Sequence, residues 1–71
     1  MERQSVKSVI LRSAGYDAMG KILEIEFRSG LVYRYTGVPE TVWTGLMKSA
    51  EAGKYFSDKI RPKFSSRQVA G

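Results

Sequence analysis

The stretch that decides the fold of this chain is residues 23–35, which run LEIEFRSGLVYRY. On both sides of the Ser29-Gly30 pair, apolar and polar residues alternate with the period of two that is typical of β-strands. Each strand has one apolar face, formed by Leu23, Ile25 and Phe27 in the first and by Leu31, Tyr33 and Tyr35 in the second. The stretch therefore predicts an antiparallel hairpin that buries one face.

The length of the hairpin loop decides which residues lie opposite each other. Directly opposed residues of an antiparallel pair point to the same face. A two-residue loop would mix the two faces, whereas the three-residue loop Arg28-Ser29-Gly30 opposes Ile25 to Tyr33 and Leu23 to Tyr35. Gly30 then occupies the left-handed position that such loops need. We therefore predict the three-residue loop.

Residues 6–16 precede the hairpin and are rich in β-branched and apolar side chains, which predicts a third strand. The same register argument opposes Leu11 to Ile25. On the outer face this arrangement predicts an exposed ion-pair row, Arg12–Glu24–Arg34.

After Tyr35 the apolar period becomes helical. A stripe at helical spacing predicts a helix near residues 39–50 and consists of Val42, Trp43, Leu46, Met47 and Ala50. Gly45 inside it is expected where the helix backbone lies close to the sheet. A shorter helix is expected near residues 53–61, ended by Pro62.

These elements predict an α+β fold: a three-stranded antiparallel β-meander over residues 6–35, packed on one helix, plus a short second helix. Seventy-one residues make one domain. We assign residues 1–64 to it and expect residues 65–71, which are small and polar, to form a frayed tail.

Composition argues against catalysis. The chain has neither Cys nor His, which removes the usual nucleophile–base pairs and most zinc sites. We therefore expect a non-enzyme without a cofactor or a metal. No window approaches the roughly 20 apolar residues of a membrane span, so a cytoplasmic location and no membrane partner are expected.

Positive charge is concentrated near the C-terminus. The chain has a net charge of +5, and residues 54–67 contain five basic groups but only one acidic group, Asp58. Such a cluster favours polyanionic partners. The alternative is a basic segment that is simply solvated.

Tyr33-Arg34-Tyr35 has two interpretations. Exposed aromatics beside a basic residue are typical of surfaces that bind single-stranded nucleic acid. However, both tyrosines share the apolar face of Leu31, which favours a structural role for the rings and leaves Arg34 on the opposite face. Trp43 is likewise expected in the core.

The ordered motifs Gly15-Tyr16-Asp17, residues 23–30 and residues 33–39, followed by Gly53-Lys54-Tyr55-Phe56 and Ile60-Arg61, resemble the KTSC domain over roughly residues 5 to 64. That family is named for its occurrence at the C-terminus of some lysyl-tRNA synthetases, and it also occurs as small free-standing bacterial proteins. The resemblance implies RNA, including tRNA, as a partner by association alone. Ala52 and Ser57 depart from the Ser and Asn that are common in the family.

We therefore predict a small binding module for RNA. The expected phosphate contacts are Lys54, Lys59, Arg61 and Lys63, with Arg34 and Arg12 in a secondary role. The alternative is an adaptor or inhibitor that docks on a protein of the transcription or translation machinery through a sheet edge or the outer sheet face, where Ile10 and Val32 flank Glu26. A homodimer that hides this face is a third interpretation.

Overall fold

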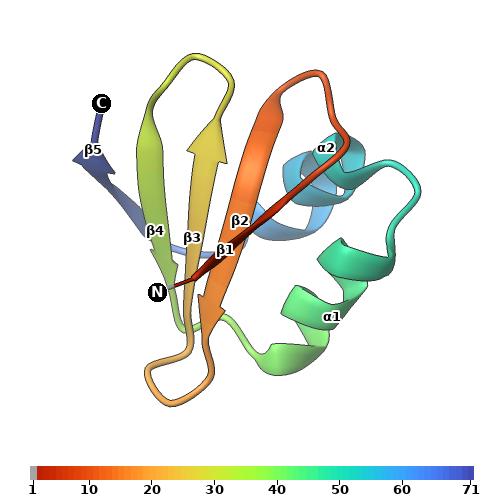
Figure 1. The fold of residues 1–71 in the computed structure, drawn as a ribbon. Coiled ribbons are helices and arrows are strands. Elements are labelled where there is room, and N and C mark those ends of the chain that lie inside the picture. Colours follow the sequence, from red (N-terminus) through yellow and green to blue (C-terminus); the bar gives the residue numbers. More distant parts are fainter. Residues whose placement is uncertain (1) are drawn as a thin grey trace.

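The computed structural model describes residues 2–71 and contains one antiparallel sheet whose strands follow chain order, with helices on one of its faces (Figure 1). The five strands are β1 (Arg3–Ser5), β2 (Leu11–Asp17), β3 (Ile22–Phe27), β4 (Val32–Thr36) and β5 (Ser66–Ala70). The helical elements are α1 (Glu40–Lys48), α2 (Ala52–Tyr55) and the π-helical turn η1 (Phe56–Ile60). In the described residues, no helix is long and apolar enough to cross a membrane.

The predicted hairpin is confirmed in register and in loop length. Ile25 lies opposite Tyr33, and Leu23 lies opposite Tyr35. The Phe27 amide donates to the Leu31 carbonyl at 2.9 Å, and Gly30 has a φ of 98°. Glycine is favoured there because other side chains rarely adopt a left-handed backbone.

The prediction of three strands is too low, since the sheet has five. Residues 6–10 are not part of a strand. The Ser8 hydroxyl accepts hydrogen bonds from the backbone amides of Ile10 and Leu11, which stabilise a turn between β1 and β2. Residues 65–71, expected to fray, instead contain β5, which pairs with β4. Its side chains are all exposed, so backbone pairing with the open edge of β4 fixes this strand without an apolar face.

The predicted pairing of the first long strand is also wrong. Leu11 lies opposite Phe27, Ala14 lies opposite Ile25, and the register shifts between Leu11 and Ser13. Such a shift marks a β-bulge, which inserts one extra residue into a strand and resets its register. This bulge places Arg12 outside the expected ion-pair row.

Arg3 takes the place predicted for Arg12 in that row. Its Nε lies 3.4 Å from Glu24 Oε2, and Arg34 Nε lies 2.9 Å from Glu24 Oε1. Gly15, on the strand between them, lies opposite both Arg3 and Glu24. Because glycine has no side chain, Arg3 can extend across β2 to reach Glu24.

The core lies between the sheet and the helices. The largest fully buried side chains come from both layers and are Phe56, Leu11, Leu23, Ile25, Leu46, Ile60 and Val38. The first helix begins after Pro39, close to the predicted position, and the second is divided between α2 and η1. The α+β class is therefore confirmed.

Two side-chain predictions on α1 have different outcomes. Trp43 packs against the core, as predicted, and its ring stacks on Tyr16 with centroids 5.7 Å apart. Gly45, however, does not face the sheet. A Cβ at this position would overlap the Tyr55 hydroxyl and lie 2.7 Å from the Tyr55 Cζ. The close approach at Gly45 is therefore a contact between helices.

Candidate functional site

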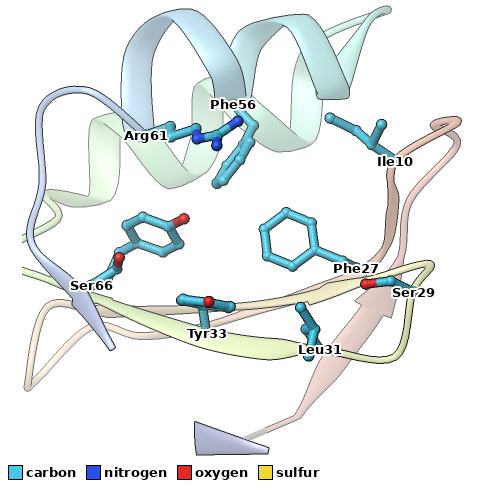
Figure 2. A pocket seen from close by; sticks show the side chains of 9 residues that line it. Ile10, Phe27, Ser29, Leu31, Tyr33, Phe56, Arg61 and Ser66 are labelled. Carbon is cyan, nitrogen blue, oxygen red and sulfur yellow. The ribbon is translucent and has the colours of Figure 1, made fainter. Parts of the chain in front are cut away.

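A cleft of about 690 Å³ opens between η1 and the inner face of β3 and β4, and we refer to it as the aromatic cleft (Figure 2). Four of its lining side chains are aromatic, namely Phe27, Tyr33, Tyr35 and Phe56. Tyr33 and Tyr35 share one face of β4 because strand side chains alternate, and β-pairing places Phe27 on the neighbouring strand on the same side. Phe56 projects into the cleft from η1.

The four rings meet edge to face and do not stack on one another. Phe27 and Tyr33 have centroids 5.8 Å apart, with planes at 83°. Phe56 contacts Phe27 at 5.5 Å and Tyr35 at 5.4 Å, again with steep interplanar angles. Edge-to-face contacts are favourable for aromatic side chains and fix their orientation. The cleft is therefore shaped before any ligand enters.

The rim of the aromatic cleft is polar. Arg61, which follows η1, directs its guanidinium toward the cleft from the helical side (Figure 2). Ser29 in the hairpin loop and Ser66 at the start of β5 contribute hydroxyl groups. Ile10 and Leu31 complete the lining. All the lining residues are neutral except Arg61, so the site favours a ligand with an apolar planar part and a negative charge.

Burial raises the pKa of the Tyr35 hydroxyl, while Ser66 and the charge of Arg61 act in the opposite direction. Tyr35 is only 4% exposed. The hydroxyl is protonated at neutral pH, as in any tyrosine, so it can donate a hydrogen bond at the cleft, and burial extends this state to higher pH.

The structure places the predicted basic residues of the C-terminal segment on more than one surface. Lys54 and Lys59 line one shallow hollow, which Glu51 and Asp58 share. Arg61 lies instead at the aromatic cleft. Lys63 is exposed in the turn that follows η1. The segment thus presents its charges on two neighbouring surfaces.

Arg12 and Arg34 lie away from this segment. Arg12 is exposed at the bulge in β2, and Arg34 is on the outer face of β4, where it is paired with Glu24. Because the carboxylate of Glu24 already neutralises it in part, Arg34 is a weaker candidate for a phosphate contact than the helical residues.

The residues of the alternative docking surface do not form an exposed apolar patch. Val32 is only 7% exposed. Ile10 lies on the helical side, where a Cβ added to Gly53 would be 3.1 Å from its Cγ1. Glu26 accepts a hydrogen bond from the Ser13 hydroxyl at 2.8 Å. Val32 does lie opposite Glu26, as expected, but it is buried. The expectation for Ile10 is wrong, because the bulge and turn before β2 move it to the helical side.

Sequence reasoning missed the aromatic cleft as a site. It placed Phe27, Tyr33 and Tyr35 on one inner face and assigned that face to the core. The signal available was the number of large rings on this face, together with Phe56 in a helix too short to cover them all. Arg61, although predicted, was not connected with the rings.

Across residues 2–71, no group of three or more acidic, Cys or His side chains is placed to hold a metal ion.

The fold and the cleft together define a small α+β domain in which one antiparallel sheet and a short helical segment enclose an aromatic cleft. The chain belongs to the KTSC domain family, whose model matches residues 7–64. The resemblance seen in the sequence motifs is therefore confirmed.

Known relatives support the assignment. The crystal structure of a KTSC domain protein from Yersinia pestis matches with a TM-score of 0.94 and 38% identity, over 97% of both chains. A protein of Stutzerimonas stutzeri is 41% identical over 63 residues, which cover 89% of each chain.

Two lysine–tRNA ligases, from Nostoc punctiforme and Trichormus variabilis, are 33% and 38% identical over 61 and 55 residues. The matched parts are 86% and 78% of this chain but only 11% and 10% of the ligases. The similarity therefore concerns a small part of each ligase.

Proposed function

We propose that this domain is a non-catalytic RNA-binding module in which the basic helical segment, defined as residues 54–63, contacts phosphates. The observation that carries the proposal is the local concentration of positive charge, since residues 54–63 contain four cations and a single acidic group, Asp58. Within residues 2–71, every ion pair lies on the outer sheet face and joins Arg3 or Arg34 to Glu24 or Glu26. The four cations of the basic helical segment are exposed, and no carboxylate oxygen of the described residues lies within the 4.0 Å of a salt bridge from them.

Cations without a protein partner are available to phosphates. Each one that neutralises a phosphate releases condensed counterions, which makes affinity fall with salt and depend little on sequence. The lysines suit this role as flexible point charges, whereas the planar guanidinium of Arg61 can contact a phosphate through two parallel hydrogen bonds. The two relatives named as lysine–tRNA ligases add that similar domains occur in chains that act on tRNA.

The test is a comparison of two triple variants that have the same net charge. Replacing Lys54, Arg61 and Lys63 with Ala removes three cations from the basic helical segment. Replacing Lys7, Lys21 and Lys48, which are also exposed, removes three cations elsewhere. Affinity for a mixed single-stranded RNA and for bulk tRNA is then measured by fluorescence anisotropy at several salt concentrations.

The first variant should lose affinity for every RNA to a similar degree. The slope of log K against log salt should flatten by about 2, since each phosphate contact to a single strand contributes about 0.7. The control variant should retain most of the wild-type slope. Equal losses in the two variants would show that only net charge matters, and unchanged affinity in the first variant would remove the basic helical segment from the interface.

A further inference from the structure

We infer that the aromatic cleft binds one unstacked nucleobase of the RNA, with the ring of Tyr33 as the stacking platform and Arg61 on the phosphate of the same nucleotide. This inference rests on the proposed function and specifies a second, chemically different contact. It begins from the rings. Figure 2 shows the Tyr33 ring lying along β4, the Phe27 ring rising from β3, and the Phe56 ring projecting from the helical side of the cleft.

The Tyr33 ring has no stacked partner in the described chain. Its one ring contact is with Phe27, at an interplanar angle of 83°. Tyr16, by contrast, already has a stacked partner, since its ring lies at an angle of 11° to that of Trp43. Bases stack on exposed aromatic faces because every base has a π-face, so the half-buried Tyr33 ring can accept one.

The size of the aromatic cleft suits a single nucleotide. Pockets that bind small molecules and cofactors range from about 300 to 1,000 Å³, and this cleft holds about 690 Å³. Its lining is also typical of such pockets, because apolar rings predominate and a few hydroxyl groups can fix the orientation of a ligand. A stack of several bases would need a longer aromatic surface.

The charge of the aromatic cleft decides whether it favours a cationic or an anionic ligand. Aromatic cages also bind quaternary ammonium groups, but Arg61 at the rim of this cleft would repel a cation. Arg61 attracts an anion, and a nucleotide joins a planar base to a phosphate. The Tyr35 hydroxyl, which is protonated at neutral pH like any tyrosine, supplies a hydrogen-bond donor beside the rings. We therefore assign a nucleotide to this site.

The test compares a short oligouridine with an abasic ribose–phosphate strand of equal length. Both carry the same phosphates, so the basic helical segment should bind both with similar salt dependence. The oligouridine should bind about tenfold more tightly, since stacking of one base has that order of effect. In Tyr33→Leu, which keeps an apolar side chain, this difference should disappear, whereas Tyr33→Phe should retain it. NMR amide dispersion checks that each variant folds.

The outcomes separate the two proposals. Equal binding of the two strands, unaffected by Tyr33→Leu, would overturn the base pocket and leave the phosphate contacts standing. No binding of either strand would overturn both. A third probe is uridine monophosphate, which should shift the ring signals of the aromatic cleft. Tighter binding of a phosphotyrosine peptide than of uridine monophosphate would overturn the assignment to a nucleotide.

Discussion

At the scale of single residues, Gly45 shows how a helix-breaking residue is retained for packing. In an exposed helix interior, Gly→Ala stabilises by about 1 kcal/mol. At Gly45 the sign should reverse, because the new Cβ would overlap the Tyr55 ring. We predict that Gly45→Ala lowers the free energy of unfolding by about 1–3 kcal/mol, the usual cost of overpacking. Urea unfolding monitored by circular dichroism measures this change.

Two controls identify the cause of the loss. Thr44→Ala, at an exposed position of the same helix, should change stability by less than about 0.5 kcal/mol. In the double variant with Tyr55→Ala, the effect of Gly45→Ala should shrink, because the ring that it strikes is gone. An unchanged effect in that background would mean that the contact between Gly45 and Tyr55 is not responsible.

Two tyrosine hydroxyls should make stability depend on alkaline pH. Burial is the largest cause that raises the pKa of Tyr35 and of Tyr16, and the Tyr16 hydroxyl also donates to the Val38 carbonyl at 2.6 Å. Below the ordinary tyrosine pKa of 10.0 this contribution to stability is fully present. As pH rises further the unfolded chain loses these protons first, so stability falls.

We predict that wild-type protein loses stability from about pH 10 upward and that Tyr35→Phe loses less. The comparison of the two proteins at each pH cancels the titration of lysines, which they share. Urea unfolding between neutral pH and pH 11 measures the difference. Parallel curves for the two proteins would contradict the link between Tyr35 and the alkaline loss.

At the scale of elements, β5 pairs with β4 although the pairing includes an unfavourable charge contact. Arg67 of β5 lies directly opposite Arg34 of β4. Like charges in directly opposed positions destabilise strand pairing, and opposite charges stabilise it by about 0.2–1 kcal/mol. We predict that Arg67→Glu raises the free energy of unfolding by an amount in this range, measured by urea unfolding at low salt.

The matched comparison is Arg67→Gln with Gln68→Glu, since each lowers the net charge by one unit, and Gln68 lies one residue along the strand, opposite Tyr33 and on the other face. Gln68→Glu should stabilise less than Arg67→Gln. High salt should reduce the difference between the two variants by screening the charges. An equal gain from both variants would indicate a general effect of net charge.

The elements also show what the sequence could and could not predict. The hairpin was predictable in detail, because the alternation of Ile25 and Tyr33 with polar neighbours and the position of Gly30 both require one register. The bulge at Arg12 was not, since no turn residue or break in the apolar pattern marks it in the sequence. Nor was β5, whose exposed polar residues have no apolar period. The aromatic cleft was missed for a different reason: Phe27, Tyr33 and Tyr35 share an apolar face, and the sequence does not show that η1 leaves part of this face uncovered.

At the scale of the whole molecule, charge is distributed unevenly. On the outer sheet face Arg3 and Arg34 pair with Glu24 and Glu26, whereas among the described residues the basic helical segment has four cations outside any salt bridge, of which Arg61 lies at the aromatic cleft. The proposed phosphate surface thus adjoins the proposed base site. This combination of an electrostatic contact and a stacking contact is common in proteins that bind single-stranded nucleic acid.

The measurement that tests this account most directly is an NMR titration of isotope-labelled protein with bulk tRNA and a mixed single-stranded RNA, at low and high salt. We predict amide shifts concentrated on residues 54–63 that fade as salt rises, together with ring shifts of Tyr33 and Phe27. Shifts confined to the outer face around Glu24, or no shifts at low salt, would contradict the account.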